Sequence, residues 1–103
     1  MATDMGGWSE TMDATEETQK ICYQVKGQVE KQTGESYREF KAVKYRNLHL
    51  MGGTHYLIKV HVGADYDHLT VVQGAGTQFP TPPSLRGVKQ HKTKDDPLEP
   101  FTN

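Results

Sequence analysis

The chain has little cysteine: of its 103 residues only Cys22 carries a thiol, so no internal disulfide can form. A disulfide-stabilised secreted fold is therefore excluded, and a reducing compartment is favoured. Long apolar runs are also lacking, because no segment approaches the roughly 20 apolar residues of a membrane-spanning helix. Residues 1–10 lack the apolar stretch of a secretory signal. We therefore expect a cytoplasmic protein with no membrane partner.

Neither sign of charge is in excess. The 12 basic and 13 acidic residues give a formal net charge of −1, which leaves no basic surplus to attract nucleic acid. Familiar catalytic motifs are lacking as well: the chain has no Gly-x-Ser-x-Gly, no phosphate-binding glycine loop and no Cys-x-x-Cys. We therefore expect no nucleic-acid partner, and an enzyme is the functional class that the sequence supports least.

The five histidines raise the question of a metal site. His55 and His61 fall in one predicted strand, about 20 Å apart along an extended chain, so they cannot share an ion. His49 and His55 flank a predicted hairpin and can approach each other, but two ligands make a poor site. We expect neither a metal nor any other cofactor.

The N-terminal half contains a polar arm followed by a predicted helix. Residues 1–12 are small, polar and glycine-containing, with Trp8 as their one aromatic residue, and we interpret them as a flexible N-terminal trunk. The helix begins near Asp13 or Thr15, either of which can cap it, and it ends at Gly34, a typical stop signal. Its apolar residues recur every fourth position and form one stripe, with Cys22 beside them as a buried structural thiol: Ile21, Val25 and Val29.

Four β-strands are predicted after the helix, because β-branched and aromatic residues alternate there with polar ones. They cover residues 37–50, 54–62, 68–73 and 88–93. The alternation slips between Ala42 and Val43, which indicates a bulge, and Leu57 is an exception to it. A tight hairpin at 51–53 joins the first two strands. A helix followed by antiparallel strands predicts an α+β fold in a single domain, residues 1–103.

Several segments, in order along nearly the whole chain, carry a resemblance to one family. They are GGWSE at 6–10, TEETQ at 15–19, FKAV at 40–43, GTHYLIKVHVG at 53–63, and KDD at 94–96 followed by Leu98 and Phe101. In these segments the chain resembles the stefins, the disulfide-free type 1 cystatins. The resemblance implies the cystatin fold, with one long N-terminal helix packed on a curved four- to five-stranded antiparallel sheet. It also implies reversible, tight-binding inhibition of papain-like (cathepsin-type) cysteine proteases.

The resemblance also assigns the protease-binding residues. In stefins a trunk and two hairpin loops form a wedge that enters the active-site cleft of the protease. These segments correspond to Gly6, Gly7 and Trp8; to His49, Leu50, Met51, Gly52 and Gly53; and to Ala75 and Gly76. His49 and Met51 stand where stefins usually have glutamine and valine. The usual Leu-Pro of the second loop is absent at Ala75-Gly76, unless Phe79-Pro80 takes its place.

These departures leave two hypotheses open. Either the chain inhibits papain-like proteases as a monomer, or it keeps the fold and acts as a protein-binding or self-associating module, for instance as a domain-swapped dimer. The trunk glycines and Gly53 favour inhibition, whereas the altered loops favour the alternative. His49 adds a further expectation. Histidine side chains change charge between about pH 5 and 7, so a histidine buried in the complex would make inhibition pH-dependent.

Overall fold

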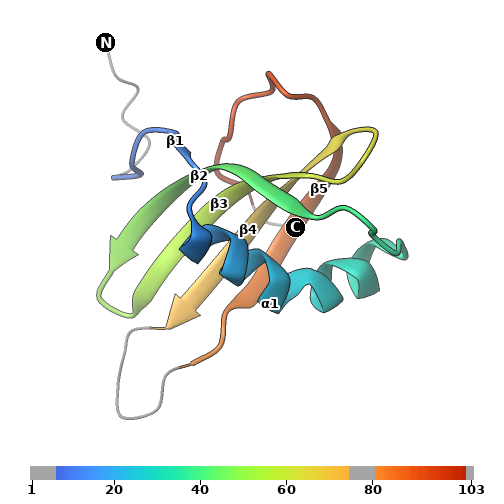
Figure 1. Ribbon diagram of the computed structural model, residues 1–103. Helices are drawn as coiled ribbons and strands as arrows, with labels where there is room; N and C mark the ends of the chain where they lie inside the picture. Colours follow the sequence, from blue (N-terminus) through green and yellow to red (C-terminus); the bar gives the residue numbers. More distant parts are fainter. Residues whose placement is uncertain (1–6, 75–80, 102–103) are drawn as a thin grey trace.

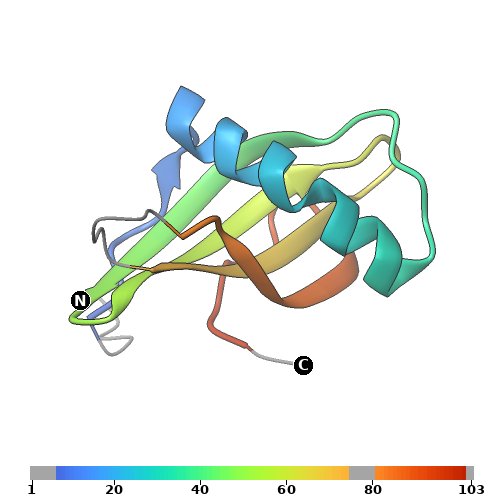
Figure 2. The ribbon, with the colours of Figure 1, turned by 90° about the horizontal axis from the view of Figure 1, so that it is seen from below.

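The computed structural model describes residues 7–74 and 81–101. Its elements follow one another as β1 (Met12–Asp13), α1 (Glu16–Thr33), β2 (Lys41–Leu50), β3 (Gly53–His61), β4 (Tyr66–Gly74) and β5 (Ser84–Lys92). The strands form one antiparallel five-stranded sheet in sequence order, and α1 lies across one face of it (Figures 1 and 2). The predicted α+β fold is confirmed. Within the described residues, no helix is long and apolar enough to cross a membrane.

The ends of α1 are fixed by its caps. The Thr15 hydroxyl accepts from the Thr18 amide at 3.3 Å, and the Thr18 hydroxyl accepts from the Thr15 amide at 3.2 Å. This reciprocal capping box satisfies amides that the first turn leaves free. At the other end, Gly34 adopts a left-handed φ of 77° and its amide donates to the Glu30 carbonyl. Asp13, the other predicted cap, pairs instead with Lys44.

The core lies between α1 and the sheet. The predicted stripe of α1 is at most 1% exposed, and it packs on residues of β2 to β5: Ala42, Ile58, Val60, Leu69, Val71 and Val88. Cys22 belongs to this cluster, as predicted. Burial raises the pKa of the Cys22 thiol to about 12, so the thiol stays protonated and inert.

The strands differ from the sequence prediction mainly at their ends. The predicted bulge is present, because the register between β2 and β3 shifts between Ala42 and Lys44. The last strand begins at Ser84 rather than at residue 88, and a short extra strand, β1, pairs with β2. A strand of two residues is too short to show alternation, so β1 could not be predicted from its residues alone.

Residues 93–101, which we call the C-terminal tail, lie against part of the second face of the sheet. The Lys59 ammonium donates to two tail carbonyls at 2.5 and 2.6 Å, and the Thr70 hydroxyl donates to the Phe101 carbonyl at 2.8 Å. Leu57, which pairs with Thr70, is fully buried yet lies outside the cluster that faces α1. The tail therefore explains why an apolar residue occupies this otherwise polar face.

Candidate functional site

The N-terminal residues from Gly7 onward run antiparallel to β2 and away from the β2–β3 hairpin, so Gly7 is the end of this segment nearest the hairpin. The Ser9 amide donates to the Asn47 carbonyl at 2.8 Å, and the Asn47 amide donates to the Ser9 hydroxyl at 3.0 Å. Gly7 has a φ of 90°, and a Cβ there would stand 3.1 Å from Cδ1 of Leu48. Of the expected flexible trunk, residues 7–12 are thus held to β2 by hydrogen bonds. Gly6 lies outside the described residues.

Two side chains fix the trunk against the rest of the protein. The Trp8 ring packs edge-on against His55 of β3, with ring centroids 6.5 Å apart and planes at 80°. Arg46 Nε donates to the Ser9 carbonyl at 2.7 Å, while its Nη1 donates to the Leu98 carbonyl at 3.0 Å. A single guanidinium therefore ties the trunk to the C-terminal tail.

The β2–β3 hairpin presents two apolar side chains to solvent. Leu50 pairs with Gly53 across a tight turn at Met51 and Gly52, as predicted. Met51 is fully exposed and Leu50 is 51% exposed. Among residues 7–74 and 81–101, Tyr23 on α1 is the only other large exposed hydrophobic side chain. Such a pair at a hairpin tip is an exposed apolar contact point.

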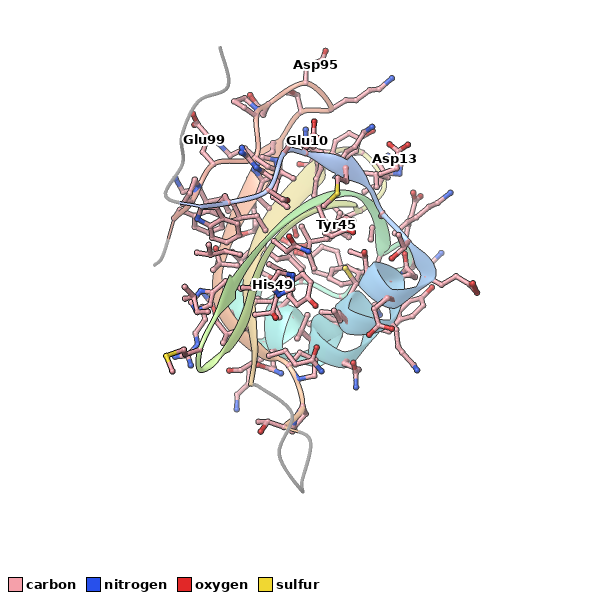
Figure 3. The ribbon with its side chains drawn as sticks, turned by 90° about the vertical axis from the view of Figure 1, so that its left-hand side faces the viewer. Glu10, Asp13, Tyr45, His49, Asp95 and Glu99 are labelled. Atoms are coloured by element: carbon pink, nitrogen blue, oxygen red, sulfur yellow. The ribbon has the colours of Figure 1, made fainter. Side chains whose placement is uncertain are left out.

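His49 lies on the arm of β2 that leads to this hairpin (Figure 3). Its Nδ1 is 3.0 Å from the Thr54 hydroxyl on the facing strand. The ring is exposed. It is therefore oriented by its own hairpin and remains accessible to a partner.

Gly53 of this hairpin lies against the end of β4, where the second loop begins. Its φ is 150°, and a Cβ there would stand 2.3 Å from the Gln73 carbonyl oxygen. At the end of β4, a Cβ on Gly74 would stand 3.1 Å from the Thr81 hydroxyl, so Gly74 and Thr81 are neighbours. The base of the second loop thus lies directly beside Gly53. Ala75 and Gly76, like the alternative pair Phe79 and Pro80, lie outside the described residues.

The structure therefore brings together most of the predicted site at one end of the sheet. The described members are Gly7, Trp8, His49, Leu50, Met51, Gly52 and Gly53, and we call this end the wedge edge. Sequence reasoning missed Arg46, because its partners are 37 and 52 positions away and no local pattern signals such a bond. Gly53, which the resemblance assigns to protease binding, is already required to be glycine by its contact with Gln73.

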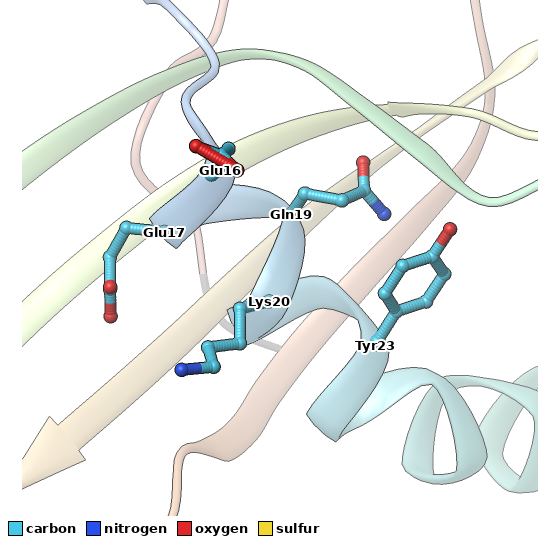
Figure 4. A pocket seen from close by; sticks show the side chains of 5 residues that line it. All are labelled: Glu16, Glu17, Gln19, Lys20 and Tyr23. Atoms are coloured by element: carbon cyan, nitrogen blue, oxygen red, sulfur yellow. The ribbon is translucent and has the colours of Figure 1, made fainter.

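A hollow beside the first turns of α1 does not form a comparable site. It is lined by Glu16, Glu17, Gln19, Lys20 and Tyr23, whose side chains spread apart rather than converge (Figure 4). The Gln19 amide is already committed, since it donates to the Phe40 carbonyl and accepts from the Ala42 amide. No group of three His, Cys, Asp or Glu side chains that could hold a metal ion occurs in the described part of the chain.

Comparisons with known proteins agree with this architecture. The cystatin domain matches residues 6–94. The chain is 43% identical over 97 residues to Cystatin-A8 of Sus scrofa, covering 93% of this chain and 92% of that one. Leukocyte cysteine proteinase inhibitor 1 of Sus scrofa gives the same identity and coverage. Stefin-C of Bos taurus is 37% identical to the chain over 99 residues, which cover 95% of this chain and 96% of Stefin-C.

The chain belongs to the cystatin family. Within that family its relatives are stefins and cystatin A proteins, which confirms the resemblance read from the sequence. The cystatin fold is likewise confirmed. Membership of this family implies an inhibitor of cysteine proteases rather than an enzyme.

Proposed function

We propose that the protein is a reversible, tight-binding inhibitor of papain-like cysteine proteases of the cathepsin type. Its wedge edge enters the active-site cleft, with the trunk at Gly6, Gly7 and Trp8 on one side and the β2–β3 hairpin in the centre. The second loop, at Ala75 and Gly76 or at Phe79 and Pro80, completes the wedge. We further propose that it acts as a monomer in the cytoplasm.

One observation carries this proposal: Leu50 and Met51 project from a hairpin that has the trunk beside it. Apolar side chains that gather at an exposed tip are typical of an interaction surface. Methionine suits such a position because its flexible, polarisable thioether adapts to an irregular wall. Replacement of the usual valine by Met51 is therefore compatible with binding in a cleft.

The wedge supplies a physical reason for inhibition without cleavage. A papain-like protease attacks a carbonyl with a thiolate that is paired with a histidine. A wedge can fill the cleft without placing a carbonyl in line with that thiolate, so the protease is blocked but the wedge stays intact. The trunk from Gly7 and the β2–β3 hairpin are already held by hydrogen bonds, so these two segments lose little entropy on docking. A standard interface of about 1,600 Å² is then enough for tight binding.

The trunk adds contacts beside the hairpin. Gly7 already uses a left-handed φ that favours glycine, and its lack of a side chain lets the backbone approach a surface closely. Trp8 supplies a large aromatic surface, a type of residue that often dominates interface energies. Its contact with His55 positions the ring before any partner arrives.

Titration of the purified protein against active papain tests the proposal. We expect peptidase activity to fall linearly to zero at one inhibitor per enzyme, and to recover on dilution or on competition with substrate. Absence of inhibition at micromolar protein would overturn it. Combined with a dimer in size-exclusion chromatography, that result would favour the self-associating module instead.

A further inference from the structure

A second feature lies at the end of the sheet opposite the wedge edge, beside the β3–β4 turn (Figure 1). There the β3–β4 turn, the segment after α1 and the end of β5 enclose a pocket of about 450 Å³. We call it the turn pocket and define it by Glu35, Tyr37, Arg38, Val62, Asp65 and Asp67. None of these residues belongs to the proposed wedge.

Asp67 is the unusual residue of the turn pocket. It is only 1% exposed, and its Oδ2 has no hydrogen-bond partner among the described residues. Burial raises the pKa of the Asp67 carboxyl, and the neighbouring Tyr37 hydroxyl offsets only part of that effect. A buried carboxylate without a counter-ion is costly, and native structures rarely leave such an oxygen unpaired. A cation that reaches Oδ2 from the pocket, after the side chains that cover this atom shift, would remove this cost.

The charges around the rim of the turn pocket also favour a positively charged ligand. Glu35, Glu39 and Asp65 contribute carboxyl groups, of which Glu39 pairs with His61 and Asp65 with His91, and Arg38 contributes a permanent positive charge. The Asp65 carboxylate accepts from His91 Nδ1 at 2.7 Å, and this bond raises the pKa of His91. Three carboxylates thus face one permanently charged cation, Arg38, around the opening, so the local field attracts positive charge where the histidines are neutral.

The backbone is shaped around Asp67. The register between β4 and β5 shifts between Tyr66 and His68, so β5 bulges opposite Asp67. The bulge contains His91 with a φ of 61°, the only non-glycine residue with positive φ in the described chain. Bulges of this kind re-aim side chains next to functional sites. Here the bulge brings His91 to Asp65 at the rim of the pocket.

We propose that the turn pocket binds an alkylammonium group of the lysine type. The apolar side chains of Val62 and Ala64, with the Tyr37 ring, line the space that a methylene stem would occupy. A single free carboxylate oxygen suits the compact ammonium ion, whereas a guanidinium prefers the paired oxygens of a bidentate contact. A metal ion is not favoured, because within residues 7–74 and 81–101 no three suitable ligands converge.

A titration of ¹⁵N-labelled protein with N-acetyl-lysine methylamide, followed by NMR, tests the site. We expect saturable shift changes confined to residues 35–39, 62–67 and 90–91. N-acetyl-norleucine methylamide, which has the same four side-chain carbons without the ammonium, should produce none. Equal shifts with both compounds, or no shifts in these segments at millimolar ligand, would overturn the proposal.

Three variants make the test specific. Asp67→Asn keeps the shape of the side chain and removes its charge, so we expect at least about tenfold weaker binding. Asp95→Asn, the same change at an exposed position of the tail, should bind as the wild type does. Arg38→Ala removes a competing cation and should strengthen binding. Unchanged affinity in Asp67→Asn, or weaker binding in Arg38→Ala, would overturn the assignment.

The source of the ammonium is resolved in the same experiment. Tighter binding of the blocked lysine than of 1,5-diaminopentane would identify a lysine side chain of a protein partner, and the reverse order a free diamine. Because the turn pocket is distant from the wedge edge, Asp67→Asn should inhibit papain like the wild type. Failure of the cation site and failure of the proposed inhibition are therefore separate results.

Discussion

Gly53 lies so close to Gln73 that a β-carbon at position 53 would stand 2.3 Å from the Gln73 carbonyl oxygen. This contact joins the β2–β3 hairpin to the end of β4, where the second loop begins. The two loops of the wedge edge are therefore not independent, because a change at the base of one displaces the base of the other.

The first prediction concerns this contact. Gly53→Ala should lower the free energy of unfolding by about 1–3 kcal/mol, since the added carbon overpacks a fixed backbone. Gly52→Ala is the matched control, because a Cβ at Gly52 meets nothing within 4 Å. Urea denaturation of both variants measures the difference. Equal stability of the two would show that the β4 backbone yields to the added carbon.

The second prediction concerns the apolar tip. Met51→Ala should weaken papain inhibition by about 1–2 kcal/mol, roughly tenfold in the inhibition constant, because a centrally placed apolar contact is lost. Its stability should stay unchanged, since Met51 is fully exposed. Tyr23→Ala, which removes an exposed aromatic residue on α1, serves as control. If both variants inhibit like the wild type, the hairpin tip does not contact the protease.

The third prediction concerns Arg46. Arg46→Lys keeps the charge but not the fork that reaches both Ser9 and Leu98. Hydrogen exchange of the Ser9 amide should therefore become faster, and the protease complex should dissociate faster. Arg86→Lys, the same change at an exposed position of β5, should alter neither. An unchanged exchange rate in Arg46→Lys would mean that β2 alone holds the trunk.

The fourth prediction concerns the pH dependence of stability. His68 is 2% exposed, and burial, followed by the charge of Lys59, lowers its pKa from 6.5 to about 4. Between these values the unfolded chain binds a proton that the folded protein does not. The contribution of the neutral His68 ring to the free energy of unfolding is thus fully present above pH 6.5, and it is lost as the pH falls toward 4. The loss is of the order of 3 kcal/mol.

Denaturation curves at several pH values test whether stability falls with pH in this direction. His68→Gln should show a shallower loss of stability between pH 6.5 and 4 than the wild type. His49→Gln, the same change at an exposed histidine, should keep the wild-type slope. A slope in His68→Gln identical to that of the wild type would contradict the assignment.

The fifth prediction concerns His49 in the complex. If the cleft buries this ring, the charged form is disfavoured there, so inhibition should weaken at pH 5 relative to pH 7. Inhibition constants of His49→Gln, divided by those of the wild type at each pH, cancel the pH response of the protease itself. His91→Gln, at the opposite end of the sheet, is the control. A ratio that is constant with pH would remove His49 from the interface.

The elements whose apolar residues recur at a regular spacing were predictable from sequence. The stripe of Ile21, Val25 and Val29 predicted the buried face of α1, and the slip at Ala42 predicted the bulge. Leu57 was recognised as an exception, but its cause could not be predicted, because the tail that covers it is distant in sequence. Periodicity reports local structure and carries no information on such long-range contacts.

The candidate site shows the same limit. Residues of the β2–β3 hairpin were identified through the resemblance, and their position at one tip follows from the turn. The bridging role of Arg46 and the unpaired oxygen of Asp67 were not predictable. Both depend on which side chains meet across several strands, and an isolated arginine or aspartate in a strand gives no local signal.

The burial of Cys22 has a practical consequence. With one thiol, held in the core and almost entirely protonated, the folded protein should resist alkylating reagents and oxidation. Only molecules that open α1 away from the sheet expose the sulfur. The rate at which a thiol reagent labels Cys22 in the purified protein therefore measures how often the core opens, with no reporter residue introduced by mutation.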